Sequence, residues 1–220
     1  MFDTPCHNPR ASGGFSLVEV AVVLVIIGLI LAAVLQGRQL IASAEYKSLK
    51  SQLSEYRNAF YTFRDRYGAL PGDFDEADTR LDLDAADNGD GDGTIDDGPG
   101  CASDGDESCL AWQHLRAAGM IDGNPNDAGT AASPRHTYGG VVESFFTGTA
   151  GNGAFDHKIA IADLPADVAR RLDEDIDDDL CDAGRVAGRS PGGGVDCDGT
   201  DPALWPGGSA RIDVVYGLGS

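Results

Sequence analysis

The sequence predicts an α+β protein in which one long N-terminal helix packs against a small antiparallel β-sheet head with disulfide-closed loops. Three observations predict this fold. An almost wholly apolar run extends from Phe15 to Leu35, an apolar stripe with helical spacing continues to Tyr67, and the rest of the chain is rich in glycine and in short β-branched segments. The 220 residues leave room for one membrane segment and one head of about 150 residues.

Residues 15–37 form the expected membrane-spanning half of the helix. The apolar run from Phe15 to Leu35 has about 21 residues, which at 1.5 Å per residue gives roughly 32 Å, against about 30 Å for the hydrocarbon core of a bilayer. A secretory signal peptide would have a shorter apolar stretch, with its small-residue cleavage site after it. Here the small residues Gly13 and Gly14 precede the run, at a point where a peptidase can hold an extended backbone.

Residues 38–67 form the expected amphipathic half of the helix. Their apolar side chains recur at spacings of four and three, which places them on one helical face. Gly68 and Pro71 are expected to end the helix. The stripe, which we assign to packing against the head, consists of Ala42, Tyr46, Leu49, Leu53, Tyr56, Phe60, Phe63 and Tyr67.

The segment Gly14–Glu19, which reads GFSLVE and is followed by the apolar run, resembles the cleavage and methylation signature of type IV prepilins and type II secretion pseudopilins. The resemblance implies that a prepilin peptidase/methyltransferase removes residues 1–14 by cleaving between Gly14 and Phe15, and methylates the new amino group of Phe15. It also implies that Glu19 guides assembly with other pilin subunits. The head would stand in the periplasm on an inner-membrane anchor before assembly, and on a cell-surface or periplasm-spanning filament afterwards.

Glu19 is also a functional candidate on physical grounds. A carboxylate inside a membrane segment costs roughly 2.5 to 3.5 kcal/mol on insertion scales, so it needs a partner. Cleavage would create one in the positively charged amino group of Phe15, either in the same helix or on a neighbouring subunit, where the pair would reward correct axial register. The alternative is a Glu19 side chain that reaches the headgroups in a simple membrane anchor.

The charges that flank the apolar run argue weakly for the opposite orientation. The leader has Arg10 as its clear cation, whereas Arg38, Lys47 and Lys50 follow the run. The resemblance and the cysteines outweigh this bias, so we expect the leader in the cytoplasm and the head outside.

Apart from Cys6, which lies in the leader, the chain has four cysteines, all beyond the apolar run. They have no CxxC spacing and no nearby histidine that would complete a zinc site, so we expect two disulfides in an oxidising compartment. Sequence allows three pairings. We expect Cys101 with Cys109 and Cys181 with Cys197, because each pair encloses a Gly/Asp-rich loop, and each closure contributes on the order of 3 kcal/mol. The alternative is four reduced, buried thiols in a cytosolic protein.

The head, residues 68–220, is expected to hold a small antiparallel sheet. Segments rich in β-branched or aromatic residues and separated by glycine-bearing turns predict strands at 141–147, 158–162 and 211–216. A helix is expected to begin near Asp163, with Pro165 in its first turn, and a short amphipathic helix is expected around Trp112. The segments 67–74 and 112–121, together with Glu107, resemble segments that follow the long helix in a subset of the pilin-like proteins.

An acidic loop at residues 82–98 has the alternating oxygen ligands of a calcium site. Aligned with an EF-hand loop, it supplies three side-chain ligands, a backbone carbonyl and a water-mediated position. Pro99 stands where the EF-hand has its bidentate glutamate, so a further ligand must come from elsewhere, with Asp84, Asp87 and Glu107 as candidates. The alternative is a solvated acidic loop without an ion. The predicted ligands are Asn88, Asp90, Asp92, Thr94 and Asp96.

Composition and motifs favour a structural protein over an enzyme. With 16 Lys and Arg against 36 Asp and Glu, the formal net charge of -20 would repel nucleic-acid phosphates, and the scattered histidines have no metal-ligand spacing. GxSxG, P-loop and HExxH motifs are absent from the sequence. The predicted function is a structural subunit of a type IV pilus-like or pseudopilus filament, and the large, disulfide-bearing head favours a pilin. The alternative is a membrane-anchored calcium-binding or adhesive protein outside the cytoplasm that does not polymerise.

Overall fold

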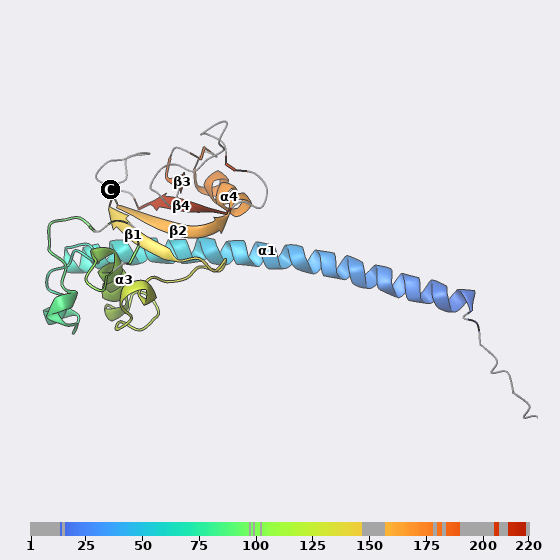
Figure 1. Cartoon of the computed structure of the whole chain (residues 1–220), viewed down its shortest axis with the longest axis horizontal. Coiled ribbons are helices and arrows are strands. Elements are labelled where there is room, and N and C mark those ends of the chain that lie inside the picture. Colours follow the sequence, from blue (N-terminus) through green and yellow to red (C-terminus); the bar gives the residue numbers. More distant parts are fainter. Residues whose placement is uncertain are drawn as a thin grey trace, which may run out of the picture. The chain divides into compact units, whose positions relative to one another are not determined.

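Helix α1 (Leu17–Tyr67) runs unbroken for 51 residues and contributes to both compact units of the chain, residues 1–44 and 45–220 (Figure 1). It lies within the predicted helix at 15–67, and Gly68 follows it with a φ of +81°, the left-handed conformation common just after a helix. The computed structural model describes Gly14, Gly98 and the ranges 16–96, 100–101, 103–146, 157–177, 180–181, 184–189, 205–206 and 211–218.

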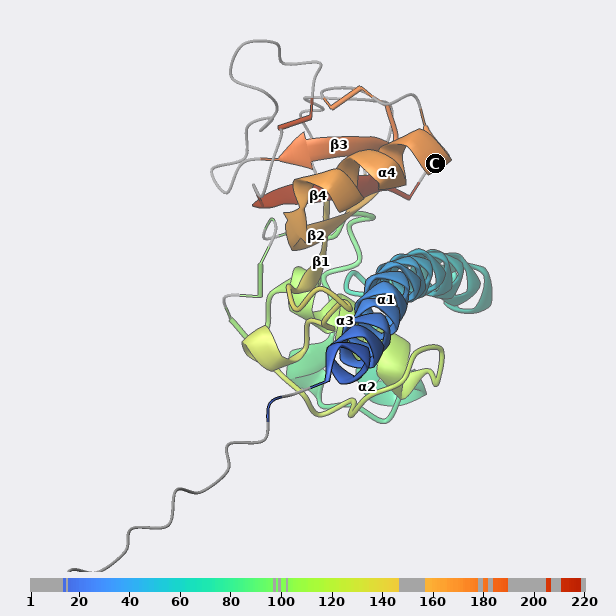
Figure 2. The ribbon, with the colours of Figure 1, turned by 90° about the vertical axis from the view of Figure 1, so that its right-hand side faces the viewer.

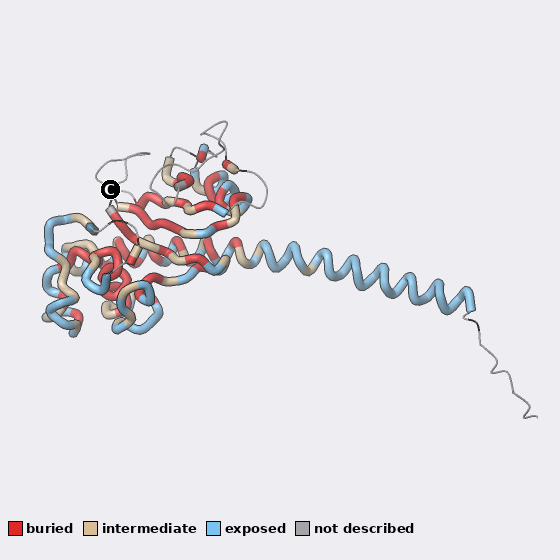
Figure 3. Tube along the Cα trace, viewed as in Figure 1, coloured by how far each residue is buried: buried red, intermediate tan, exposed pale blue. Residues whose placement is uncertain are grey.

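The first unit is a helix with apolar side chains on every side. No residue from 17 to 44 is buried, and only Gly37 and Ser43 are partly shielded (Figure 3). By length and composition, this part of α1 can cross a membrane. A helix that is apolar all round requires an apolar environment or partner helices, because about 0.8 kcal/mol is gained for each CH₂ group removed from water.

The second unit combines the remainder of α1 with short helices and one antiparallel sheet. The described strands have the order β1-β2-β4-β3, and Figures 1 and 2 both place β1 nearest to α1 and α3 and β3 farthest from them. The elements are α2 (Ala77–Arg80), η1 (Ala85–Asp87), α3 (Glu107–Ala117), η2 (Gly129–Ala131), β1 (Val142–Phe146), β2 (His157–Pro165), α4 (Ala166–Ile176), β3 (Val186–Arg189) and β4 (Arg211–Gly217).

The three predicted strands are all present, as β1, β2 and β4. The strand β3 pairs with β4 and was not predicted, because it has four residues and one of them is Gly188. The helix expected near Asp163 begins three residues later, since β2 continues to Pro165 through a bulge between Ile161 and Leu164. At this bulge Asp163 has a φ of +58°, and its N–H donates to Asp213 Oδ1 at 2.9 Å.

One face of α1 contributes to the core of the second unit. Within the predicted stripe, Ala42 is exposed and Tyr67 is half-buried. Trp112 of α3 is fully buried and packs edge-on against Tyr56 and Phe60, with ring centroids 5.1 and 5.7 Å apart. This packing fixes α3 to α1. The buried α1 residues are Tyr46, Leu49, Leu53, Tyr56, Ala59, Phe60 and Phe63.

Helix α4 packs on the sheet and also reaches α1. The Tyr46 hydroxyl donates to Asp175 Oδ2 at 2.6 Å and lies 3.1 Å from the carbonyl oxygen of Arg171. Burial raises the pKa of Tyr46, and the Asp175 carboxylate raises it further. Lys50 Nζ lies 2.9 Å from the same carboxylate, but this pair is exposed and adds little to stability.

Cys101 and Cys109, a predicted pair, form a disulfide with a Cα–Cα distance of 5.1 Å. Both are buried, against Ala132. The short loop that they close contributes roughly 2.5 kcal/mol in the chain-entropy model. Cys181 is disulfide-bonded as well, and its predicted partner Cys197 lies outside the described residues.

Candidate functional site

The start of α1 carries the residues predicted for cleavage and assembly. Gly14 is exposed, and Phe15, the predicted methylation site, lies outside the described residues. Ser16 precedes the helix: its carbonyl accepts the N–H of Glu19 at 3.0 Å, and its Oγ accepts the N–H of Val18 at 3.4 Å. Glu19 therefore stands exposed in the first helical turn, where the helix dipole stabilises a negative charge.

The acidic loop is joined to the head at its entry. Asn88 Oδ1 accepts the N–H of Asp78 at 2.9 Å, and Asn88 Nδ2 donates to Asp78 Oδ1 at 3.1 Å. The N–H of Gly89 donates to the carbonyl oxygen of Phe74 at 3.0 Å. A Cβ at Gly89 would overlap the carbonyl oxygen of Gly72 and lie 2.6 Å from the Cα of Asp73. The two backbone segments can approach this closely only because residue 89 is glycine.

Three carboxylates converge at the loop. Asp73 comes from the turn after α1 and is 3% exposed, whereas Asp90 and Asp92 are exposed residues of the loop. One oxygen from each lies within 4.8 Å of the other two. The N–H of Gly93 donates to both oxygens of Asp73, at 3.2 and 3.1 Å. Calcium takes six to eight oxygen ligands, so these carboxylates fit a site that waters or carbonyls would complete.

Glu107, the first residue of α3, closes the loop. Its Oε1 accepts the N–H of Asp90 and its Oε2 accepts the N–H of Asp96, both at 2.9 Å. The side chain is 6% exposed. Glu107 therefore holds both ends of the segment that carries Asp92 and Thr94.

The electrostatics of the cluster favour a cation. Burial raises the pKa of Asp73, and the charges of Asp92 and Asp90 raise it further. Burial also raises the pKa of Glu107, although the two backbone N–H groups that it accepts oppose this rise. A divalent cation would stabilise the charged forms of both carboxylates and relieve the repulsion among them.

His114 of α3 joins the segments on either side of the loop. It is fully buried, its Nδ1 accepts the N–H of Gly72 at 3.0 Å, and its Nε2–H donates to the carbonyl oxygen of Asp87 at 2.7 Å. These two bonds require a neutral imidazole with its proton on Nε2. Burial lowers the pKa of His114 to about 4, so the ring is neutral at physiological pH.

Comparison with known families concerns the start of α1. Residues 9–35 match the family described as the prokaryotic N-terminal methylation motif. The chain carries the prepilin signature of type IV pilins and pseudopilins. No curated protein matches the chain, and no solved structure matches it.

The prepilin signature covers Gly14, Phe15 and Glu19 together with the exposed apolar part of α1. It supports a type IV pilin-like or pseudopilin subunit, which is a structural protein, and it implies processing by prepilin peptidase. An inner-membrane anchor with a head outside the cytoplasm is consistent with it. The acidic loop lies outside the matched residues.

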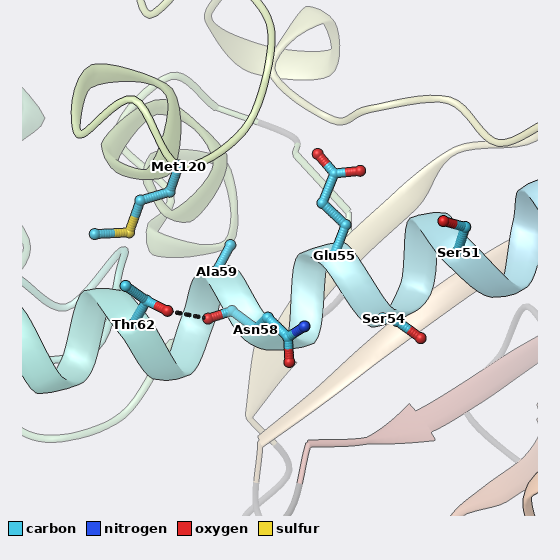
Figure 4. Close-up of a pocket in the computed structure, with 7 residues that line it drawn as sticks. All are labelled: Ser51, Ser54, Glu55, Asn58, Ala59, Thr62 and Met120. Carbon is cyan, nitrogen blue, oxygen red and sulfur yellow. Dashed lines mark hydrogen bonds between the residues drawn. The ribbon is translucent and has the colours of Figure 1, made fainter.

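The head of this prepilin-like chain also has a groove of about 490 Å³ on the exposed side of α1 (Figure 4). Small polar side chains line most of it, and Thr62 Oγ1 donates to the carbonyl oxygen of Asn58 at 2.7 Å. The exposed side of α1 is therefore polar in the head, in contrast to the apolar residues matched by the signature. The lining residues are Ser51, Ser54, Glu55, Asn58, Ala59, Thr62 and Met120.

Of the five predicted metal ligands in this prepilin-like chain, the structure brings Asp90 and Asp92 into the cluster. The side chain of Asn88 is bonded away from it. Thr94 Oγ1 lies 2.6 Å from Asp92 Oδ1 and 2.9 Å from Asp96 Oδ1, so the last two predicted residues border the cluster through hydrogen bonds.

The third carboxylate of the cluster comes from Asp73, which was not predicted. The candidates Asp84 and Asp87 instead form a capping box, in which the N–H of Asp84 donates to Asp87 Oδ2 at 3.1 Å. Glu107 accepts backbone N–H groups, as described above. A signal for Asp73 was available in the sequence: it is the charged residue within the otherwise uncharged Leu70–Phe74.

Proposed function

We propose that this chain is a structural subunit of a type IV pilus-like or pseudopilus filament, assembled through its apolar helix after prepilin peptidase removes residues 1–14. The observation that carries the proposal is the prepilin signature, with Glu19 in the first turn of a helix whose residues 17–44 include none that is buried. Such a surface requires lipid before assembly and neighbouring helices afterwards.

Glu19 would select the correct neighbour. In an apolar surrounding its carboxylate needs a counter-charge, and cleavage exposes the amino group of Phe15 as the first cation of the mature chain. A pair between Glu19 of one subunit and Phe15 of the next forms at one axial offset, because any other offset leaves a charge buried without a partner. The size of the head and its disulfides favour a pilin over a secretion pseudopilin.

Substitution of Glu19 tests this role. We expect Glu19→Ala and Glu19→Gln proteins to be processed normally and to remain in the membrane, yet to be lost from sheared filaments. Glu45→Ala, a change in the same helix beyond the apolar run, is the matched control and should assemble at wild-type levels. The intact mass of the membrane form should show loss of residues 1–14 and the addition of one methyl group.

Two results would contradict the proposal. Wild-type levels of Glu19→Ala protein in filaments would refute the assembly role of Glu19. A mature chain that keeps its initiating methionine would refute the processing on which assembly depends, and would favour a membrane-anchored protein that does not polymerise.

We also propose that the head binds one calcium ion at the acidic loop, through Asp73, Asp90 and Asp92. The supporting observation is the convergence of these three carboxylates, one of them buried, within 4.8 Å. Three like charges at this spacing repel one another unless a cation lies between them. Calcium fits better than magnesium because calcium accepts six to eight oxygen ligands in variable geometry, whereas magnesium requires near-ideal octahedral geometry.

A thermal melt tests calcium binding. A site with the affinity of extracellular calcium modules, about 10⁻⁴ M, would stabilise the head by about 2.7 kcal/mol at 10 mM calcium, which corresponds to a rise of roughly 5 to 10 °C in Tm. The melt is compared with one in excess chelator and one in 10 mM magnesium, where we expect a smaller rise. An unchanged Tm with calcium would count against a structural ion.

A further inference from the structure

The Cys101–Cys109 disulfide lies between the acidic loop and the start of α3. Cys101 follows the loop, and Cys109 is in the first turn of α3, two residues after Glu107. Both sulfur-bearing side chains are buried. The bond therefore ties the exit of the loop to the helical turn that carries Glu107.

The start and the middle of α3 are held by different contacts. Asp106 stands at the N-cap of α3. Its carboxylate accepts the N–H of Ser103 at 2.8 Å, inside the segment that the disulfide closes. The middle of α3 is anchored independently by Trp112 and His114, which are fully buried. The start of α3 has two further, longer hydrogen bonds, from Ser108 Oγ to the carbonyl oxygen of Gly100 and from Ser144 Oγ to the carbonyl oxygen of Ser108, both at 3.3 Å. Without the covalent link, these long bonds would hold the first turn less firmly than the buried side chains hold the middle of the helix.

Glu107 transmits such a change to the loop. Both of its carboxylate oxygens hold backbone N–H groups, those of Asp90 and Asp96, on either side of Asp92. If the first turn of α3 shifts, both bonds weaken together. The carboxylates of Asp90 and Asp92 then lose the backbone arrangement that brings them toward Asp73.

We propose that the Cys101–Cys109 disulfide controls the calcium affinity of the acidic loop through Glu107, and this proposal rests on the calcium binding proposed above. Oxidation of the two thiols transfers two electrons and two protons to an oxidant that carries a disulfide, and that disulfide is reduced to two thiols. The site would thus bind calcium more tightly in an oxidising compartment than in a reducing one. By thermodynamic linkage, bound calcium favours the disulfide over the dithiol by the same factor as the disulfide raises calcium affinity.

Calcium titration of the full chain in detergent tests the proposal. We expect the Cys101→Ala/Cys109→Ala protein to bind calcium at least fivefold more weakly than the oxidised wild type, in the usual range of coupling between sites. The Cys181→Ala/Cys197→Ala protein is the matched control, since Cys181 follows α4 in the chain and does not border the acidic loop or α3 in sequence, and it should bind within twofold of the wild type. Glu107→Gln should weaken binding alone and add little to the Cys101→Ala/Cys109→Ala change, because both act on one path.

Hydrogen exchange in excess chelator gives a second readout that does not depend on calcium. The amides of Asp90 and Asp96 should exchange faster in the Cys101→Ala/Cys109→Ala protein, while that of Leu115 in the middle of α3 should keep its protection. Unchanged affinity with unchanged exchange would overturn this proposal and leave calcium binding intact. Absence of calcium binding by the oxidised wild type would overturn both.

Discussion

Replacing Asp73 with asparagine should weaken the response of the head to calcium and change which protein, variant or wild type, has the higher Tm. The asparagine side chain has the shape of the aspartate side chain, and its amide oxygen can still accept the N–H of Gly93, so the packing of the turn is kept. The substitution removes the buried member of three converging carboxylates. Without calcium this relieves repulsion and the burial of a charge, and we expect a Tm equal to or above that of the wild type.

With calcium the same substitution should destabilise the protein relative to the wild type. Loss of one of three charged ligands is expected to weaken binding at least tenfold. The calcium-dependent stabilisation at 10 mM then falls from about 2.7 to at most about 1.4 kcal/mol, and the rise in Tm is roughly halved or smaller. The two melting curves therefore change order between chelator and calcium.

Differential scanning calorimetry of wild-type and Asp73→Asn proteins, each in chelator and in 10 mM calcium, measures this change in the order of the two Tm values. Asp122→Asn, which neutralises an exposed carboxylate outside the cluster, is the control and should show the full calcium response. A full calcium response in the Asp73→Asn protein would show that the cluster is not the site. A drop of several degrees in its chelator Tm would show instead that the charge of Asp73 is needed for folding.

Three further predictions concern the packing around the loop. Gly89→Ala should lower Tm and abolish the calcium response, because the added methyl group would overlap the backbone of Gly72. The control is Gly105→Ala, whose Cβ would have no atom within 4 Å and which should leave both unchanged. Calorimetry with and without calcium measures both effects. The folded pKa of His114, about 4, lies below its unfolded value of 6.5, so the unfolded chain binds more protons between these pH values. The free energy of unfolding therefore falls by up to about 3 kcal/mol as the pH drops from 6.5 to 4. Urea titrations from pH 7 to 4 should show a smaller fall for the His114→Gln protein, and an equal fall would refute the role given to His114. Trp112→Ala should lower the free energy of unfolding by about 3 to 5 kcal/mol, as for other buried aromatic residues, and a loss below 1 kcal/mol in the same titrations would contradict its place in the core.

The long helix and three strands were predictable because their signals are local. The four-three spacing from Tyr46 to Phe63 gives the buried face of α1 directly, and Gly68 marks its end. The strand β3 was not predicted because its four residues, including Gly188, owe their strand conformation to pairing with β4 and not to intrinsic β propensity.

The sequence of the acidic loop points to two of the three converging carboxylates, Asp90 and Asp92, and not to the third. An EF-hand alignment treats the ligands as one continuous loop. In the structure the third carboxylate of the cluster belongs to Asp73, which lies in the turn after α1, 17 residues before Asp90. Asn88 fits the alignment, but its amide is bonded to Asp78, a contact that no spacing within the loop reveals. Glu107, a candidate ligand in the sequence, instead holds the loop backbone, because both of its oxygens accept N–H groups.

The boundary in α1 between exposed and buried side chains has a practical consequence. Because no residue from 17 to 44 is buried and Tyr46 is the first that is, a recombinant chain that begins at residue 43 would retain every buried side chain of α1. Such a truncated head should dissolve without detergent, since the apolar half of the helix is gone. The truncated head would then be suitable for solution NMR, which could follow the effect of added calcium on each residue.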